Sequence, residues 1–436
     1  ALLLMANKFQ QSPSLQLIYA DEDKISTNNT RFEPHFKPEW NQDLLYSQNY
    51  IGHPILLQTK KLNSIGGFNL GLEGSQDHDL LLRYTADLTS NQIHRIPKIL
   101  YHWRAHEEST AGNAEAKNYT TQAGIKALQN HFQSKKQQVT ISQGKLENTY
   151  RVQWPVPHQQ PLVSLIIPTH NGYDILSNCI NSIIKKTSYK NYEIIIVNNR
   201  TNCQKTLDFI ADVVKNNIHI HTLDWDHPFN YSAINNFAAK HADGSILGLI
   251  NNDIEVINTR WLTEMVSHAI RADIGCVGGK LYYPNNQIQH AGVILGIGGI
   301  AGHGHKHFQR EKSGYFSKLE LIQNYSAVTA ACLLIEKNIF NQVNGLDQKN
   351  LPIAFNDVDF CIRVRNAGYR NIWTPYAELY HHESVSRGSD NTPEKIKRAN
   401  KEVQYMKNTW GKSLTQDPAY NPNLTLTHEN YSIKSV

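Results

Sequence analysis

The amino-acid sequence predicts an α/β protein with a mostly parallel sheet, because strand-like runs alternate with helix-like segments. Short β-branched runs at 162–168, 192–199 and 245–253 are typical of buried strands. Apolar residues recur at helical spacing at 174–186 and 231–242, between those runs, and Asp174 is the candidate N-cap of the first segment. Strands and helices that alternate in this way form parallel sheets with right-handed crossovers.

Polar side chains follow each predicted strand, where ligands of parallel sheets bind. They are His170 and Asn171, then Asn198 and Asn199, then the triplet Asn251–Asn252–Asp253. We therefore expect a ligand site at the edge of the sheet that these strand ends share.

Composition excludes several other classes of protein. The 436 residues are 40% hydrophobic, with a mean hydropathy of −0.49, which is enough apolar content for packed cores. The net charge of +5, without a long run of like charges, gives no support to nucleic-acid binding and is compatible with anionic ligands such as nucleotides.

The cysteines and the apolar runs bear on the compartment. Five cysteines without a CxxC pair form neither a disulfide framework nor a zinc site, and they fit a reducing compartment. The weakly polar run at 291–302 is far shorter than the roughly 20 residues that a membrane helix needs. We expect a cytoplasmic protein.

An internal repeat divides the chain. The acidic cluster YADEDK, then IGGF, SQDHDLLLR and LYHWR precede residue 105, and INND, VNGLD, FNDVDFCIR and LYHHES follow in the same order after residue 250. The interval from Asp79 to His102 equals that from Asp359 to His382, which indicates two copies of one unit. We expect a first copy at 1–135 that lacks its front half, a proline-rich linker at 136–160, and a complete second copy with a C-terminal extension at 161–436.

The repeated acidic and histidine positions suggest a divalent cation and a base. Asp253 and His382 are candidate ligands for Mg²⁺ or Mn²⁺, which a few protein groups hold and phosphate oxygens complete. The alternative is that Asp253 caps a turn and His382 is an interior histidine. Asp357 is the candidate general base, whereas Asp359 is expected to pair with Arg363. Negative charge at a helix N-terminus is the plainer explanation for both aspartates.

The same pattern recurs in the first copy, and one further segment is rich in histidine. The candidate residues of the N-terminal partial site are Asp21, Asp23, Asp77, Asp79 and His102. In AGHGHKH, His303, His305 and His307 alternate with other residues. The flanking glycines favour a loop that is solvated or contacts an acceptor over a metal site.

The second copy resembles the family 2 glycosyltransferases through an ordered series of blocks. These are LVSLIIPTHNG, YEIIIVNN, FNYSAINN, LINNDIEV, QHAGVILGIGG, YSAVTAACLLIEK, AFNDVDFCIR and YAELYHHESVSRG. The first copy resembles the back half of the same family through YADEDK, FKPEW, EGSQDHDLLLR and YHWR. The resemblance implies the GT-A fold and an inverting enzyme, similar to those of bacterial polysaccharide and O-antigen assembly.

The resemblance also assigns roles to single residues. Pro168, His170 and Asn171 match the first nucleotide-contacting loop, and Asn198 and Asn199 match the loop that reads the base. Asn251–Asn252–Asp253 stands at the Asp-x-Asp metal motif, Asn356–Asp357 at the acidic pair with the base, and His382 at the late metal-binding histidine. Arg387 is expected to contact the diphosphate. Three positions depart from the family pattern, because Asn198, Asn251 and Asn356 replace acidic residues.

The expected activity is metal-dependent transfer of a sugar from a UDP- or dTDP-sugar to a saccharide or lipid-linked acceptor. Asp357 would take the proton of the attacking hydroxyl, and the protein would contact the cytoplasmic face of the inner membrane peripherally. One alternative is a non-catalytic carbohydrate-binding or scaffold protein derived from such domains. The other is a sugar nucleotidyltransferase, which PTHNGYDIL disfavours because it lacks a glycine-rich basic phosphate loop.

Overall fold

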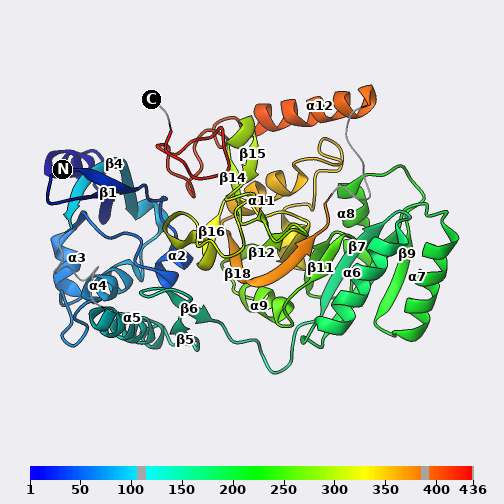
Figure 1. The fold of residues 1–436 in the computed structure, drawn as a ribbon, viewed down its shortest axis with the longest axis horizontal. Helices are drawn as coiled ribbons and strands as arrows, with labels where there is room; N and C mark the ends of the chain where they lie inside the picture. Colours follow the sequence, from blue (N-terminus) through cyan, green and yellow to red (C-terminus); the bar gives the residue numbers. More distant parts are fainter. Residues whose placement is uncertain (106–113, 384–391, 435–436) are drawn as a thin grey trace.

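The computed structural model describes residues 1–105, 114–383 and 392–434. These residues form two main sheets with helices packed against them (Figure 1) and two further two-stranded sheets. The smaller sheet and its helices come from the first copy, and the larger sheet comes from the second. A helix long and apolar enough to cross a membrane is absent from the described part of the chain.

The larger sheet confirms the predicted α/β class. Its ten strands include the path β11-β18-β12-β17-β10-β7-β8-β9, in which β17 and β11 run antiparallel to the others. The strands of this path are β7 (Val163–Thr169), β8 (Tyr192–Asn198), β9 (Ile220–Asp224), β10 (Ile246–Ile250), β11 (Ile254–Val256), β12 (Ile274–Tyr282), β17 (Cys332–Glu336) and β18 (Arg370–His381). β13 (Ile288–His290) pairs with β12, and β16 (Gln323–Tyr325) pairs with β18.

Helices cover both faces of this sheet, as the alternating pattern predicts. The helices are α6 (Tyr173–Lys186), α7 (Gln204–Asn216), α8 (Tyr231–His241), α9 (Trp261–Ala269), α10 (Lys337–Gln342), α11 (Asn356–Asn366) and α12 (Pro393–Trp410). Apolar residues of α6, α7 and α9 pack on one face, and those of α8, α10 and α11 pack on the other. β7 and β10 are buried along their whole length because both of their faces are covered.

The smaller sheet reproduces the back half of the larger one. It contains β1 (Leu17–Ile25), β2 (Arg31–His35), β3 (Ile55–Leu57) and β4 (Ile93–Arg104). Its helices are α1 (Leu2–Gln11), α2 (Gln42–Ser47), α3 (Thr59–Ser64), α4 (Gln76–Thr85) and α5 (Ala114–Ser134). β1 pairs with antiparallel β3 and parallel β4, just as β12 pairs with antiparallel β17 and parallel β18. β1 is therefore the counterpart of β12.

This topology corrects the alignment of YADEDK with INND. Asp21 and Asp23 lie within β1, the counterpart of β12, whereas Asp253 follows β10. The two acidic clusters match in sequence order and differ in position within the sheet.

A shared set of contacts supports the repeat at atomic detail. Arg83 Nε donates to Asp79 Oδ2 over 2.9 Å and Nη1 donates to the carbonyl of Ile65 over 2.9 Å. In the second copy, Arg363 Nε donates to Asp359 Oδ2 over 2.8 Å and Nη1 donates to the carbonyl of Val343. Each arginine thus ties the helix start to the turn before it, which agrees with the structural role expected for Asp359.

Two local predictions need correction. The predicted linker at 136–160 contains a hairpin of β5 (Thr140–Gln143) and β6 (Tyr150–Gln153), which packs against α5 and α2. Asp174 does not cap α6. The N-cap position is Gly172 at φ 69°, a left-handed conformation that suits glycine, and Asp174 lies in the first turn.

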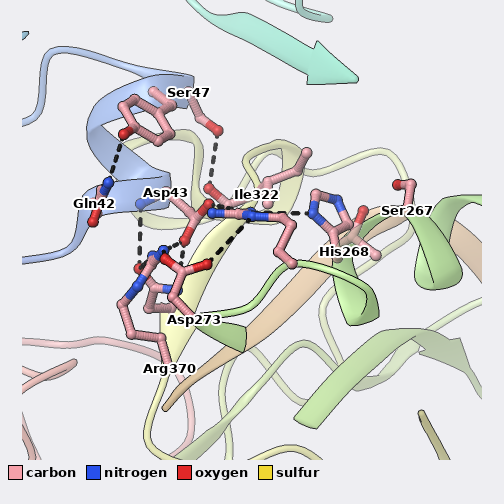
Figure 2. Close-up of polar contacts among 12 residues, drawn as sticks. Gln42, Asp43, Ser47, Ser267, His268, Asp273, Ile322 and Arg370 are labelled. Carbon is pink, nitrogen blue, oxygen red and sulfur yellow. Dashed lines mark hydrogen bonds and ion pairs between the residues drawn. The ribbon is translucent and has the colours of Figure 1, made fainter. Parts of the chain in front are cut away.

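A buried charge cluster joins the two copies (Figure 2). Asp43 on α2 is 2% exposed and accepts hydrogen bonds from Arg271, over 2.8 Å, and from Arg370. Burial alone would raise the pKa of Asp43, but the charges of the two arginines outweigh it and hold that pKa well below its ordinary value. Ser47 Oγ also donates to the carbonyl of Ile322 over 2.9 Å. These bonds therefore hold α2 against β16, Arg271 and Arg370 of the second copy.

The C-terminal segment makes a second connection between the copies. Asn421 Nδ2 donates to Asp21 Oδ1 and Oδ2, both over 3.0 Å, and to the carbonyl of Lys37 over 2.9 Å. Asn423 Nδ2 donates to the carbonyl of Pro97 over 3.0 Å. The extension after α12 thus packs on the first copy as well as on the domain that precedes it.

Candidate active site

The site lies at the edge of the larger sheet where its parallel strands end. β7, β8, β9, β10 and β18 run in the same direction, so the residues that follow them meet at one edge. The segment before β17 reaches the same edge because that strand runs the opposite way. All the described candidate residues of the second copy gather there.

The predicted nucleotide loops are tied to one another by their own side chains. His170 Nδ1 lies 2.7 Å from the carbonyl of Asn199, and Asn171 Oδ1 accepts from the amides of Asn202 and Cys203, each over 3.0 Å. Asn199 is buried, and its amide donates to the carbonyl of His227 over 2.8 Å. Pro168 lies inside β7. These contacts connect the loops after β7, β8 and β9 into one surface.

Asn198 has a partner that the sequence did not suggest. Its Nδ2 donates to Asp224 Oδ1 over 2.9 Å, and its Oδ1 accepts from the amide of Thr201 over 3.1 Å. Asp224 ends β9 and is exposed. A carboxylate therefore stands beside the position at which the family usually has an aspartate. Only the pairing of β8 with β9 reveals this, because the two residues are distant in sequence.

Asp253 is held next to a histidine by the pairing of β11 with β18. Ile254 pairs with His381 in register, and Asp253 Oδ1 lies 3.1 Å from His381 Nε2. Both residues are 6% exposed. Burial works to raise the pKa of Asp253, but the hydrogen bond and charge of His381 dominate and lower it. Asn251 Nδ2 lies 3.4 Å from the same imidazole nitrogen.

The side-chain neighbour of Asp253 is thus His381, whereas the interval between the repeats had indicated His382. His382 contacts Asp253 through its backbone amide, which donates to the carbonyl of Asp253 over 2.9 Å. His382 Nε2 faces Glu255 Oε2 over 3.0 Å. The repeat can also be aligned one residue earlier. LYH at 100–102 matches LYH at 379–381, so the counterpart of His102 is His381.

These residues suit a divalent cation as part of its ligand set. Asp253 Oδ1 faces only the imidazole of His381, and the buried His381 Nδ1 has no hydrogen-bond partner among the described residues, so the site contains unsatisfied polar capacity. No group of three His, Cys, Asp or Glu side chains in the described ranges is arranged to hold a metal alone. A cation here would need ligand oxygens, as Mg²⁺ and Mn²⁺ sites with bound phosphates do.

Asp357 is fixed at the start of α11. Its Oδ2 accepts from the amide of Ala330 over 3.1 Å and its Oδ1 accepts from the amide of Val358 over 2.9 Å. Burial raises the pKa of Asp357, although these backbone amides act in the opposite direction. The preceding residue but one, Phe355, has φ 58°, which is a strained conformation for a bulky residue.

One backbone segment joins this carboxylate to the Asp253 region. The amide of Ala330 binds Asp357, and the carbonyl of the next residue, Ala331, accepts from the amide of Asn251 over 2.9 Å. Asn252 Nδ2 reaches Thr169 Oγ1 over 3.3 Å and connects the same turn to β7. Asn356 points away from this cluster and donates to the carbonyl of Ile353 over 2.8 Å.

The candidate residues of the first copy are mostly engaged in structural contacts. Asp21 is fully buried and bonded to Asn421, as described above. Asp23 contacts Arg31 Nε over 2.6 Å and His102 Nδ1 over 2.5 Å. Asp77 Oδ2 accepts from Asn49 over 2.9 Å. The structure brings Asp23 together with His102, whereas Asp21, Asp77 and Asp79 make their hydrogen bonds to other residues. Arg387 lies outside the described residues.

The strands and helices alternate, and polar residues and the buried carboxylate of Asp253 lie where the strands end. These features define an α/β protein with a ligand site at the edge of its sheet. Residues 164–342 match the family described as Glycosyl transferase family 2. These residues lie within the second copy, whose sequence resembles the same family.

Two relatives cover nearly the whole chain. It is 46% identical over 100% of its length to "Uncharacterized protein y4gI" of Sinorhizobium fredii, and spans 48% of that protein. It is 36% identical over 98% of its length to "O-antigen biosynthesis protein RfbC" of Myxococcus xanthus, and spans 33% of that protein. The chain thus spans about half or less of the length of these curated relatives.

One solved structure with a similar outline is the mannosyltransferase PcManGT from Pyrobaculum calidifontis in complex with GDP-Man and Mn²⁺. It has 15% sequence identity and a TM-score of 0.43, covering 62% of this chain and 69% of that chain.

Proposed function

We propose that this chain is an inverting glycosyltransferase that moves a sugar from a UDP- or dTDP-sugar to a saccharide or lipid-linked acceptor. The observation that carries the proposal is the placement of Asp357. Residues 330 and 331 hold its carboxylate beside the strand end that carries Asn251 and Asp253. A base beside a diphosphate-binding edge is what transfer to a hydroxyl requires.

Asp357 supplies the proton acceptor. A general base must be ionised at the working pH, and its strength increases with its pKa. Burial raises the pKa of Asp357, which makes the carboxylate a stronger base than an exposed aspartate. It takes the proton of the acceptor hydroxyl as the oxygen attacks the anomeric carbon opposite the leaving diphosphate. Attack from that face inverts the anomeric configuration.

The loops after β7, β8 and β9 form the nucleotide side of the site. The exposed carboxylate of Asp224 and the amide of Asn198 together offer an acceptor and a donor for the edge of a pyrimidine base. The amide of Asn199 is used within the protein, so this residue shapes the loop and leaves base contact to its neighbours. His170, Asn171 and Pro168 keep the adjoining loop in place.

Asp253 and His381 would hold the cation, with Asn251 beside them. His382 stays a candidate from the sequence, and it faces Glu255 when free of ligand. Mg²⁺ or Mn²⁺ bound there would neutralise charge on the departing diphosphate. The side chain of Asp253 positions the β10–β11 turn for this role through its contact with His381.

The relative named as an O-antigen biosynthesis protein suggests where such a reaction would act. We propose a role in bacterial polysaccharide assembly on the cytoplasmic face of the inner membrane, where lipid-linked acceptors are presented.

The direct test is a donor screen. UDP- and dTDP-sugars, with GDP-mannose for comparison, are incubated with the purified chain and MnCl₂, MgCl₂ or EDTA, and free nucleotide is measured. The proposal expects release from a UDP- or dTDP-sugar that needs the metal and is lost in Asp253→Ala. Release by Asp253→Ala at the wild-type rate would reject the site. The absence of turnover and binding for every donor would reject the activity.

A further inference from the structure

Two histidines lie next to the site, and the proposed reaction does not use them. His290 ends β13 and is fully buried, and His303 ends β15 (Ala301–His303) and is partly buried. Their Nδ1 atoms lie 2.8 Å apart. Only one hydrogen fits between two nitrogens at this distance, so one ring donates and the other accepts.

The other nitrogen of His290 decides which ring donates. His290 Nε2 faces the backbone amide of Thr329, with the nitrogens 3.5 Å apart. A backbone N–H can only donate, so His290 Nε2 must present its lone pair. A neutral His290 ring therefore carries its proton on Nδ1 and donates it to His303 Nδ1.

This assignment also determines the tautomer of His303. Because His303 Nδ1 accepts, a neutral His303 ring carries its hydrogen on Nε2. Burial lowers the pKa of His290 well below its ordinary value and that of His303 to about 4, so both rings are neutral at physiological pH. Within the described part of the chain, His303 Nε2 makes no hydrogen bond and is not a buried unpaired atom. The Nε2–H of His303 is thus free to donate a hydrogen bond to a ligand.

The position of the pair indicates which ligand this donor meets. The nucleotide loops follow β7, β8 and β9, on the far side of β10 from β17. His290 belongs to β13, which pairs with β12 on the opposite side of β17. Thr329, which orients His290, directly precedes Ala330, the residue that holds Asp357. The pair therefore lies on the side of the site where the proton acceptor lies.

The backbone also holds His303 rigidly. Its amide donates to Glu429 Oε1 over 2.7 Å, and β15 pairs with β14 (Val293–Leu295) in register. A donor fixed in this way loses little conformational freedom when it binds an oxygen.

We propose that His303 Nε2–H donates a hydrogen bond to an oxygen of the acceptor saccharide and so orients the hydroxyl that faces Asp357. The proposal rests on the proposed transferase function. It assigns His303 to acceptor binding and leaves the nucleotide to the loops after β7, β8 and β9.

The first test measures the tautomers without any ligand. Long-range ¹H–¹⁵N NMR correlations on ¹⁵N-histidine-labelled protein distinguish Nδ1–H from Nε2–H rings, and His303→Gln identifies the His303 signals. We expect Nδ1–H for His290 and Nε2–H for His303. Protonation of His303 on Nδ1 overturns the proposal.

The second test measures binding with defined probes. Affinities of methyl glycosides of glucose, galactose, N-acetylglucosamine and rhamnose, and of UDP and dTDP with MnCl₂, are compared among wild type, His303→Leu, His303→Gln and the control His307→Leu. Loss of one neutral hydrogen bond should weaken saccharide binding about five- to tenfold in His303→Leu, with nucleotide binding unchanged. His303→Gln should recover much of that loss, because its amide can donate from a similar position. His307 is exposed and serves as the matched histidine from the same segment.

Each result has a definite meaning. Equal saccharide affinity in His303→Leu and wild type, or saccharide binding by neither, overturns the acceptor contact. A selective loss of nucleotide binding also overturns it, because the donor would then be the ligand of His303. A wild-type chain that transfers no sugar and yet shows the saccharide loss in His303→Leu rejects the proposed activity and keeps the contact.

Discussion

The two copies share the same back half, but in the described residues the acidic side chains of the first copy make mostly structural contacts, whereas Asp253 and Asp357 of the second copy lie at the proposed site. In both copies an arginine, Arg83 on α4 or Arg363 on α11, pairs with the aspartate four residues earlier on the same helix. The arginine also donates to a backbone carbonyl of the loop that precedes the helix. The aspartate two residues before this one, Asp77 in the first copy and Asp357 in the second, has different surroundings in the two copies. Both aspartates accept from the amide of the following residue, His78 or Val358. The other oxygen of Asp77 accepts from the side chain of Asn49, whereas that of Asp357 accepts from the amide of Ala330, beside the turn that carries Asp253.

The backbone before these two aspartates also differs. Ser75, at the N-cap of α4, has φ −144°, which any residue adopts, whereas Phe355, at the N-cap of α11, has φ 58°. A left-handed aromatic residue costs on the order of 1–3 kcal/mol and persists where the surroundings enforce it. The two copies thus share the contacts of the helix arginine with the aspartate and the preceding loop. The strained start of α11 occurs in the copy with the candidate site and not at the corresponding position of α4.

The largest expected effect is on Asp357. Asp357→Asn keeps the shape of the side chain and removes the proton acceptor, so transfer should fall about 10²- to 10⁴-fold while UDP or dTDP affinity stays within about twofold. Asp77→Asn changes the corresponding residue of the first copy and should leave transfer unchanged. Initial rates and calorimetric nucleotide titrations on both variants measure this. Near-normal transfer by Asp357→Asn would remove Asp357 from the mechanism.

The next effect is on the connection between the copies. Asp43→Asn leaves Arg271 and Arg370 without their buried carboxylate, so the free energy of unfolding should fall by about 3 kcal/mol at pH 7. Urea denaturation monitored by tryptophan fluorescence measures it. An exposed pair offers the control, since Asp226→Asn removes the partner of Arg200 and should change stability by less than about 1 kcal/mol.

The sign of the pH dependence follows from the lowered pKa of Asp43. The folded state binds the proton more weakly than the unfolded state, whose aspartate has its ordinary pKa near about 3.9. The stabilisation is therefore complete above about pH 5 and is lost as the pH falls through and below the ordinary value. The difference in stability between wild type and Asp43→Asn should shrink on acidification. A difference that grew towards pH 3 would contradict the pairing.

A smaller effect distinguishes two adjacent histidines. His381→Ala removes the neighbour of Asp253 and should weaken manganese-dependent nucleotide binding about tenfold, whereas His382→Ala should change it less than about threefold. The two variants differ by one position in the same segment, so each is the other's control. A larger loss in His382→Ala would restore the ligand pair indicated by the sequence interval.

The smallest effect concerns the pH profile of transfer. The raised pKa of Asp357 means that this carboxylate is protonated, and therefore inactive as a base, at a higher pH than an exposed aspartate. The acid limb of kcat/KM should accordingly lie above the ordinary aspartate pKa of about 3.9. A limb at or below that value would show that another group accepts the proton.

The sequence predicted the elements of the second copy well because their patterns were strong. The runs that became β7, β8 and β10 are mostly apolar and β-branched, and α6 begins and ends within one or two residues of the predicted span. The hairpin β5–β6 was missed because its strands are short and polar and depend on packing against α2 and α5.

The sequence predicted the site residues that directly follow a recognisable strand, and it missed those that reach the site through strand pairing. His381, Asp224 and Thr329 were not singled out, because their roles depend on strand pairing between residues far apart in sequence. Asp21 and Asp23 were matched to the wrong strand, since sequence order alone cannot separate β10 from β12. In each case the missing information was the position of a strand in the sheet.

We expect this chain to have one nucleotide site, which belongs to the second copy. Isothermal titration with UDP and with dTDP, in MnCl₂, measures the stoichiometry on wild type, Asp253→Ala and Asp23→Ala. One equivalent per chain, lost in Asp253→Ala and retained in Asp23→Ala, is the predicted result. Two equivalents per chain, or a single equivalent lost in Asp23→Ala instead, would contradict it.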